Sequence, residues 1–373
     1  MTIHDLTVRA YRLAVTWADM TTTEFPTIWL RDNCPSGLHP QTHERLLDLL
    51  SLEDAPVLSS AEFDGNDVQL VYADGHISQL PSSLLSQHRP GQRAADPAAI
   101  EARLWRSEHS VARYPASPLL EDDTALVNWM QVTAVDGLSI VENLDDRTSA
   151  GVDVAERIDF LRKTNFGTTF EVINKPDPNN LAYTSVALPL HTDLPNQEVP
   201  PGYQFLHCLA NEATGGGSLF ADGFAMAEDL RAEDTEAFDL LCNVAIPFRF
   251  HDGDADILVY KPVITLGAGG NVIEIRYNAH LAGVFDMPAD IMPAYYRAYR
   301  TYMHKTRDPK YRITLKLKAG EMVVFDNRRV LHGRDSFDPS TGFRHLHGCY
   351  VDRGEFASRL RLLSRQTRVI KAA

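Results

Sequence analysis

The sequence predicts a mainly β protein with flanking helices, in which a small β-rich N-terminal domain precedes a larger jelly-roll domain. Eight short apolar runs follow residue 166, each bounded by Gly, Pro, Asn or Asp, and this pattern is typical of an antiparallel barrel. Residues 8–85 carry a separate series of short alternating runs. The length of 373 residues also exceeds the usual size of one hydrophobic core.

We place the domain boundary near residue 95, so that the domains span 1–95 and 96–373. Residues 86–118 carry prolines at both ends, and their Ala-, Glu- and Arg-rich middle predicts a helix. Further helices are expected at 123–137, 153–165, 223–243 and 289–306. Strands are expected at 166–174, 181–190, 203–210, 243–251, 257–266, 271–278, 312–327 and 345–351.

Composition excludes several classes of protein. The chain has 36 Lys and Arg against 50 Asp and Glu, so its net charge of −14 disfavours nucleic acid as a partner. Charged residues interrupt the N-terminal segment, which is unlike a secretory signal. No run of the sequence approaches the roughly 18 apolar residues of a membrane-spanning helix. Neither secretion nor membrane anchoring is therefore expected. The four cysteines lie far apart, which favours reduced thiols in the cytoplasm.

Two distant motifs predict a metal centre. His191 and Asp193 are two residues apart and would share one face of a strand, and His332 lies far downstream at another predicted strand end. Two histidines and one carboxylate form the facial triad of non-haem Fe(II) oxygenases, which leaves positions open for a 2-oxo acid and dioxygen. A structural zinc site would require a closed shell of four ligands. A His-x-Asp tripeptide alone is also typical of a turn whose Asp caps backbone amides.

Arg344 is the candidate anion-binding residue. The β pattern around it would direct its side chain into the barrel, where an unpaired guanidinium is costly. The distal carboxylate of 2-oxoglutarate is the expected partner, and a structural Arg–Asp pair is the alternative. Thr214, which precedes the turn Gly215–Gly217, would add a hydroxyl to the same site.

Four long blocks of sequence, at 191–209, 214–224, 325–337 and 344–363, resemble the γ-butyrobetaine hydroxylase and trimethyllysine hydroxylase family, and the similarity runs nearly end to end. The resemblance implies a small N-terminal zinc domain and a catalytic double-stranded β-helix that binds Fe(II) and 2-oxoglutarate, usually in a homodimer. It implies His191, Asp193 and His332 as iron ligands and Arg344 as the anchor of 2-oxoglutarate.

The resemblance also implies an aromatic box that binds a trimethylammonium group through cation–π interactions. Phe166 and Phe170 stand where the family leads us to expect Tyr and Trp, so this box has fewer hydroxyl groups. The alternative is that these rings are ordinary core aromatics. The box positions are Phe166, Phe170, Tyr183 and Tyr350.

The opposite end of the substrate should be an anion. Position 279 is alanine where similar proteins often carry paired asparagines, and Tyr203 is a phenol where an aliphatic residue is common. Additional donors suit a phosphonate, which presents three oxygens. We therefore expect hydroxylation of 2-(trimethylammonio)ethylphosphonate at the carbon bonded to phosphorus, with γ-butyrobetaine as the rival substrate. The expected donors are Asn180, Tyr203, Arg276 and Asn278.

The N-terminal domain matches the opening of the family's zinc motif at residues 29–35, but Ser36 and His39 replace two of its cysteines. Cys34, His39 and His76 remain as competent ligands for Zn(II), with His43 as a candidate fourth. Because three ligands alone make a poor structural site, an apo domain is the alternative.

Two other classes of function remain open from the residues. A barrel that binds a quaternary amine without catalysis would keep the aromatic box and lose redox activity. A zinc hydrolase would use the same His-Asp-His set and would act without dioxygen.

Overall fold

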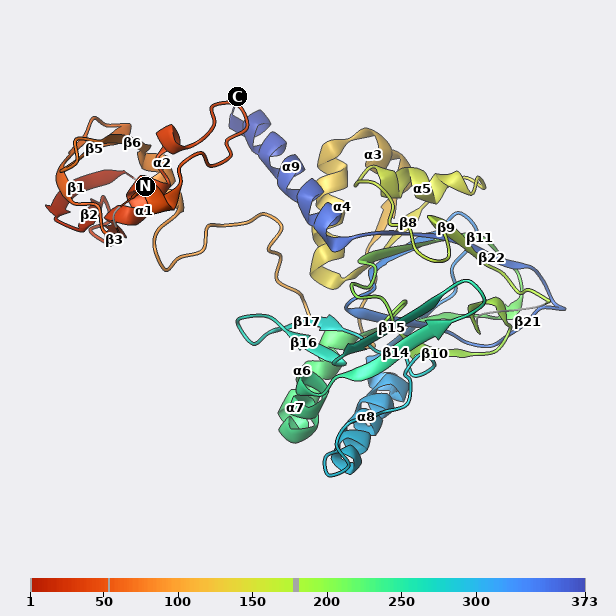
Figure 1. Cartoon of the computed structure of the whole chain (residues 1–373). Helices are drawn as coiled ribbons and strands as arrows, with labels where there is room; N and C mark the ends of the chain where they lie inside the picture. Colours follow the sequence, from red (N-terminus) through yellow and green to blue (C-terminus); the bar gives the residue numbers. More distant parts are fainter. Residues whose placement is uncertain (1, 53, 177–180, 373) are drawn as a thin grey trace. The chain divides into compact units, whose positions relative to one another are not determined.

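The computed structural model describes residues 2–52, 54–176 and 181–372, and the chain divides into two compact units, Met1–Asp96 and Pro97–Ala373 (Figure 1). The smaller unit contains two three-stranded antiparallel sheets and two short helices, α1 and α2. The first sheet is β1 (Ile3–Arg9), β2 (Arg12–Trp17) and β3 (Thr22–Pro26), and the second is β4 (Leu58–Phe63), β5 (Asp67–Tyr72) and β6 (Ile77–Pro81). The helices are α1 (Thr27–Asp32) and α2 (Ser82–Gln87).

One buried face of each small sheet forms the core of this unit. Val68, Leu70 and Tyr72 alternate with more exposed residues along β5, as a half-buried strand requires. They belong to the same apolar cluster as Trp17 and Phe25 of the first sheet.

The larger unit is built on two β-sheets that form the predicted jelly roll. One sheet has the strand order β10-β20-β13-β18, and the other has the order β7-β8-β19-β11-β22-β9. The first comprises β10 (Leu188–His191), β13 (Ser218–Asp222), β18 (Arg312–Leu315) and β20 (Val330–Arg334). The second comprises β7 (Arg113–Pro115), β8 (Leu138–Glu142), β9 (Thr169–Val172), β11 (Tyr203–Asn211), β19 (Met322–Asp326) and β22 (Arg344–Val351).

Apolar residues of both sheets, among them Phe220 of β13 and Phe325 of β19, form one buried cluster between them. Three two-stranded pairs complete the β structure: β12 (Thr214–Gly215) with β21 (Phe337–Asp338), β14 (Ile246–His251) with β15 (Asp256–Lys261), and β16 (Ile264–Leu266) with β17 (Val272–Ile275). The mainly β fold class is therefore confirmed.

Helices cover the sheets in two groups (Figure 1). One group packs on the six-stranded sheet, and the other packs around the strands β14–β17. The first group is α3 (Ala116–Glu121), α4 (Asp123–Asp136), α5 (Ser149–Glu156) and α9 (Arg353–Ala372), and the second is α6 (Gly223–Glu233), α7 (Thr235–Asn243) and α8 (Met292–Arg307). Within the described residues, no helix has the length and apolarity to cross a lipid bilayer.

Local sequence explains where these helices begin and end. Asp122 caps α4 by accepting a hydrogen bond from the N–H of Thr124, and Gly137 ends it in the left-handed conformation with φ of 70°. The predicted single helix at 223–243 is two helices, because Asp234 leaves the helical conformation and caps α7.

The helix expected in the middle of residues 86–118 is not formed. Between α2 and β7 the chain has neither helix nor strand, and it is held by tertiary contacts instead. Arg103 binds the buried carboxylate of Asp136, and the indole of Trp105 donates to the carbonyl of Asp136 at 2.7 Å. These contacts within the larger unit outweigh the local helical propensity around residues 103–105.

Gly137 provides a test of this local geometry. An added Cβ would lie 3.0 Å from Cδ of Arg329, and the left-handed φ disfavours any side chain. We expect Gly137→Ala to lower the free energy of unfolding by about 1–2 kcal/mol, measured by urea denaturation. Gly253→Ala is the control, because nothing lies within 4 Å of its added Cβ. Equal stability of the two variants would contradict this account.

Candidate active site

A cavity of about 420 Å³ lies in the jelly-roll unit, which is a typical size for a small-molecule site. The two large sheets, the β14 strand and the loops after β9 and β17 all contribute to its walls. Its lining includes His191, Asp193, His332, Arg344, Asn278, Phe166, Phe170, Tyr183 and Tyr350.

The three triad residues meet through the pairing of β10 with β20. His191 stands directly opposite His332 in this antiparallel pair, and the two imidazole rings are 4.4 Å apart. Asp193 follows the end of β10, and its Oδ1 lies 3.3 Å from Nε2 of His191 and 3.6 Å from Nε2 of His332. One ligand atom from each residue lies within 4.8 Å of the other two, so the set could hold one metal ion.

The electrostatics of the triad suit a cation. Burial opposes the charged form of Asp193, but His332, His191 and the hydroxyl of Tyr350 outweigh it and hold the pKa of Asp193 below its usual range. The Tyr350 hydroxyl donates to Asp193 Oδ2 at 2.8 Å. Burial lowers the pKa of His332 to about 3, so this imidazole is neutral near pH 7 and offers a lone pair.

Arg344 lies in the same cavity, and no carboxylate among residues 2–52, 54–176 and 181–372 pairs with its charge. Its Nε has no hydrogen-bond partner among the described residues, and burial lowers the pKa of the guanidinium. Gly216 permits the close approach of the neighbouring turn, because a Cβ there would lie 3.2 Å from Nε and Cδ of Arg344. An unpaired buried guanidinium is costly, so the geometry fits an anionic ligand such as 2-oxoglutarate.

Thr214 does not line the cavity, which corrects the prediction that its hydroxyl contributes there. It lies exposed on β12, where the pairing with β21 directs it away. Ser218 takes this place in the cavity wall on β13, at the far end of the glycine turn. The TGGGS block predicts a hydroxyl beside the glycine turn, and in the structure the hydroxyl at the cavity wall belongs to Ser218 and not to Thr214.

Aromatic rings form one wall of the cavity. Phe170 stacks on Tyr350 with ring centroids 5.1 Å apart, and Phe166 meets Phe250 edge to face at 5.4 Å. Phe250, on β14, was missed because nothing in its local sequence distinguishes it from a core residue. The amide of Asn278 also faces the cavity, while its Oδ1 accepts from the N–H of His280. Asn180 lies outside the described residues.

The structure does not place Tyr203 in the cavity. Its ring stacks on Phe356 of α9 with centroids 3.8 Å apart, in the core beneath the helices. The period of two along β11 explains this, because Gln204 and Leu206 face the cavity and Tyr203 faces the opposite side. The prediction that Tyr203 binds the substrate anion is therefore wrong.

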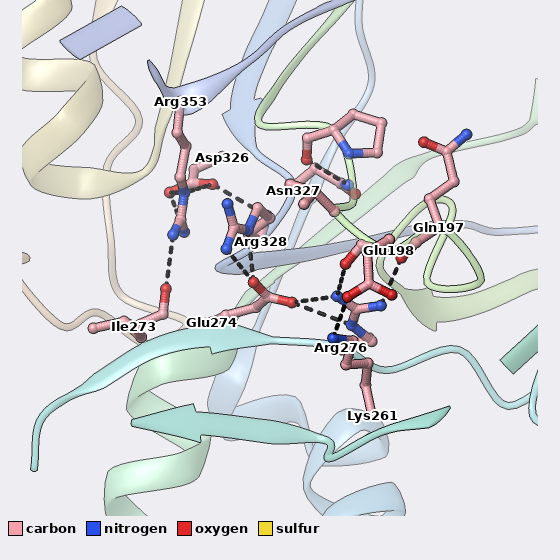
Figure 2. Close-up of polar contacts among 12 residues, drawn as sticks. Gln197, Glu198, Lys261, Ile273, Glu274, Arg276, Asp326, Asn327, Arg328 and Arg353 are labelled. Atoms are coloured by element: carbon pink, nitrogen blue, oxygen red, sulfur yellow. Dashed lines mark hydrogen bonds and ion pairs between the residues drawn. The ribbon is translucent and has the colours of Figure 1, made fainter. Parts of the chain in front are cut away.

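Arg276 also lies outside the cavity lining, so its predicted contact with the substrate anion is wrong too. Its guanidinium is 4% exposed and is saturated by protein groups (Figure 2). It pairs with Glu274 and donates to the carbonyls of Pro195, Gln197 and Glu198. These partners leave no donor for a ligand.

The zinc ligands proposed in the smaller unit do not come together. Among residues 2–52, 54–176 and 181–372, the His191, Asp193 and His332 set is the only group of three or more metal-ligand side chains within metal-binding range. Cys34 is buried with Sγ 3.0 Å from Oγ of Ser36, and Nδ1 of His39 accepts from the backbone of Thr42. The structure thus corrects the prediction that Cys34, His39 and His76 form a zinc site.

Comparisons with known proteins agree with this architecture. Residues 102–350 match the model of the taurine catabolism dioxygenase TauD, TfdA family, and residues 5–83 match the γ-butyrobetaine hydroxylase-like N-terminal domain. The chain is 42% identical to γ-butyrobetaine dioxygenase of Pseudomonas sp. (strain AK-1), covering 95% of this chain and 94% of that protein. It is 32% identical to mitochondrial trimethyllysine dioxygenase of Bos taurus, covering 92% and 83%.

Solved structures support the fold alone. AAD-2 in complex with Mn(II) and N-oxalylglycine aligns with a TM-score of 0.51 at 15% identity, over 68% of this chain and 97% of that one. A putative α-ketoglutarate-dependent taurine dioxygenase from Burkholderia xenovorans aligns with a TM-score of 0.50 at 14% identity, over 68% and 91%.

Fold and site together define an Fe(II)- and 2-oxoglutarate-dependent oxygenase with a double-stranded β-helix. The chain belongs to the TauD, TfdA dioxygenase family, and its N-terminal unit is of the γ-butyrobetaine hydroxylase-like type.

The low pKa of His332 predicts a pH dependence. A histidine in the unfolded chain titrates near ~6.5, whereas His332 in the folded chain titrates at about 3, so only the unfolded state gains a proton between these values. The free energy of unfolding of the metal-free protein should therefore fall by up to about 2 kcal/mol from pH 7 to pH 5. In His332→Gln this contribution should be absent. Identical pH dependence of both proteins in urea denaturation would contradict it.

The unpaired Arg344 predicts the opposite sign of effect from a paired arginine. Arg344→Met should raise the melting temperature of the cosubstrate-free protein, because it removes an uncompensated buried charge. Arg329→Met should destabilise by about 3–5 kcal/mol, because it leaves the buried carboxylate of Asp222 without its partner. Differential scanning fluorimetry compares the two, and a loss of stability in Arg344→Met would contradict the assignment.

Proposed function

We propose that this enzyme hydroxylates a small trimethylammonium zwitterion. The observation that carries the proposal is that the His-Asp-His triad, the unpaired Arg344 and a wall of aromatic rings line one cavity. The relatives named above act on γ-butyrobetaine and trimethyllysine according to their names, and this chain matches them over nearly its whole length.

The proposed roles follow from the geometry. His191, Asp193 and His332 would hold Fe(II), which when bound supplies the activation of dioxygen with 2-oxoglutarate as the reductant. Arg344 binds the distal carboxylate of 2-oxoglutarate, and Ser218 replaces Thr214 as the nearby hydroxyl. Overall, 2-oxoglutarate and dioxygen become succinate and CO₂ while one oxygen atom enters the substrate as a hydroxyl.

The aromatic wall binds the trimethylammonium group. Phe166, Phe170, Tyr183 and Tyr350 present ring faces or edges to the cavity, and each cation–π contact contributes about 0.5–2 kcal/mol in a desolvated site. A quaternary amine donates no hydrogen bond, so the missing hydroxyl at position 166 and the missing indole N–H at position 170 cost nothing in recognition. The hydroxyl of Tyr350 is already committed to Asp193, which couples the box to the triad.

The two candidate substrates differ in their anionic group, which is a carboxylate in γ-butyrobetaine and a phosphonate in 2-(trimethylammonio)ethylphosphonate. Tyr203 and Arg276, the two donors that favoured a phosphonate, are engaged in the protein interior. We therefore take γ-butyrobetaine as the first candidate, hydroxylated at the carbon β to its carboxylate.

The phosphonate 2-(trimethylammonio)ethylphosphonate is the second candidate. Arg249, His251 and His280 line the cavity; the guanidinium of Arg249 already pairs with Asp256, and the imidazole N–H groups of His251 and His280 could donate to the additional oxygen of a phosphonate. Position 279, beside Asn278, is alanine.

One competition experiment distinguishes them. The enzyme is incubated with Fe(II), 2-oxoglutarate and three competing substrates, namely γ-butyrobetaine, 2-(trimethylammonio)ethylphosphonate and trimethyllysine. The masses of the products are then measured by mass spectrometry. We expect one zwitterion to gain one oxygen atom in step with succinate, and γ-butyrobetaine to be consumed first. Faster conversion of the phosphonate would select the second candidate.

His191→Ala and an anaerobic incubation are the controls, and both should abolish the product. Turnover without dioxygen would instead indicate a hydrolase, and binding of the zwitterions without succinate would indicate a non-catalytic barrel.

We further propose that the enzyme is a cytoplasmic homodimer. All four cysteines are free thiols in the described chain, which suits a reducing compartment, and the family resemblance implies the dimer. Light scattering after size-exclusion chromatography tests the oligomeric state, and a monomeric mass would contradict the proposal.

A further inference from the structure

The loop that carries Asp193 has no secondary structure of its own to hold it. After β10 ends at His191, the chain runs without helix or strand as far as β11, and Leu194 adopts a left-handed φ of 52°. Such a segment keeps one conformation only if other parts of the protein satisfy its backbone groups. The position of the Asp193 carboxylate therefore depends on what binds residues 192–201.

Asn327 binds Asp193 at two points. Its Oδ1 accepts the backbone N–H of Asp193 at 2.6 Å, and its Nδ2 donates to the carbonyl of Asp193 at 3.1 Å. The same Nδ2 also donates to the carbonyl of Pro201, near the end of the loop. Asn327 is fully buried in the turn between β19 and β20, and β20 carries His332. One amide thus ties the backbone of one triad residue to the strand of another.

Arg276 holds the next stretch of the loop from the other side. Its Nη1 donates to the carbonyls of Pro195 and Gln197, each at 2.8 Å, and its Nη2 donates to that of Glu198 at 3.2 Å (Figure 2). The planar fork of a guanidinium can serve several acceptors at once, which an ammonium cannot do in the same geometry.

The segment after β17 also clamps the residue between the two triad members of the HTD motif. The N–H of Thr192 donates to the carbonyl of Tyr277 at 2.7 Å, and the N–H of Tyr277 donates to the hydroxyl of Thr192. Arg276 therefore sits on a backbone that is itself paired with this motif.

Buried charges join the two anchors into one network. Glu274 accepts from Arg276 with Oε1 and from Arg328 with Oε2, and Arg328 is the neighbour of Asn327 (Figure 2). Asp326 accepts from Arg353 at the start of α9 and from the N–H of Arg328. The ion pairs connect β17, the β19–β20 turn and α9, so both anchors approach the loop from segments that are bound to one another.

We propose that Asn327 and Arg276 are positioning residues that hold the Asp193 carboxylate in register with His191 and His332 for the metal. The proposal rests on the proposed role of these three residues as the iron centre. It gives Arg276 a different function from the substrate contact expected from the sequence, and the two functions predict different measurements.

The test measures metal affinity in the full chain after chelation of bound metal. Mn(II) is the probe, and the concentration of free Mn(II) is measured by electron paramagnetic resonance. Asn327→Asp keeps an acceptor for the Asp193 N–H but loses both donors, and Arg276→Lys keeps the charge but loses the fork. We expect the Kd for Mn(II) to rise about 10- to 100-fold in Asn327→Asp and about tenfold in Arg276→Lys.

Two control variants separate positioning from general loss of stability. Arg329 is as buried as Arg276 and binds a carboxylate and two carbonyls, but its partners are Asp222, Val135 and Arg103. Asn211 donates to the carbonyl of Leu317, away from the triad. Arg329→Lys and Asn211→Asp should change melting temperature without changing the Kd for Mn(II). A rise in Kd in these controls equal to that in the test variants would overturn the proposal.

Kinetics at saturating metal separate the two functions of Arg276. If it positions the loop, Arg276→Lys leaves the KM for the zwitterion within about twofold of the parent while metal affinity falls. A raised KM with unchanged Mn(II) affinity would mean that Arg276 contacts the substrate, and would overturn the proposal.

His191→Ala separates this proposal from the proposed function. If His191→Ala binds Mn(II) as the parent does, the iron centre itself is wrong and the positioning proposal fails with it. If His191→Ala loses Mn(II) while Asn327→Asp and Arg276→Lys bind it normally, only the positioning proposal fails.

Discussion

The antiparallel pairing of β10 with β20 is the constraint on which the rest of the site depends. It sets His191 opposite His332 although the two residues are far apart in the sequence. Because side chains alternate between the faces of a sheet, a slip of one residue in this register would turn one imidazole away from the cavity. The register is maintained on the other side of β20, where β13 pairs with it over Ser218 to Asp222. The jelly roll therefore acts as a frame whose backbone hydrogen bonds fix the positions of two of the three triad residues.

The third triad residue is held by hydrogen bonds from a side chain and not by the backbone hydrogen bonds of a sheet. Asp193 lies beyond the last residue of β10, so ladder hydrogen bonds do not reach it, and the side chain of Asn327 binds its backbone instead. Charged side chains of a surrounding network, among them Glu274 and Arg276, form ion pairs with one another within the interior. A buried ion pair adds little net stability when compared with apolar packing, but it has strict geometric demands. The sheet positions the two histidines, whereas the polar network positions the loop of Asp193. This explains why Arg276, Arg328 and Arg353 lie near the cavity but do not line it.

Burial gives the cavity its chemical character. It keeps His332 neutral and leaves Arg344 as a cation to which no described residue supplies a counter-charge, while the neighbouring imidazoles and Tyr350 keep Asp193 ionised. Each group is thereby held in the protonation state that a cation or an anion from outside would require. The unfavourable electrostatics of the ligand-free cavity are offset by the apolar clusters around it, which lie between and outside the sheets. Binding of the metal and the cosubstrate would relieve these unfavourable interactions, and this relief would contribute to their affinity.

The sequence by itself determined the two-part organisation, the mainly β fold and the chemistry of the centre, because short apolar runs and a His-x-Asp pair leave local signals. It also indicated the aromatic residues Phe166, Phe170, Tyr183 and Tyr350 through the resemblance to a known family. Only the tertiary structure decided which donors face the cavity. Tyr203 and Arg276 have the right chemistry, but the strand period turns one into the core and backbone carbonyls engage the other. The tertiary structure also decided that Ser218 and not Thr214 lines the cavity, and that Cys34, His39 and His76 do not come together. It further decided that the segment near Trp105 is not helical. Residue type limits what a side chain can bind, whereas its direction and its competing partners are set by segments remote in the chain, which no local pattern contains.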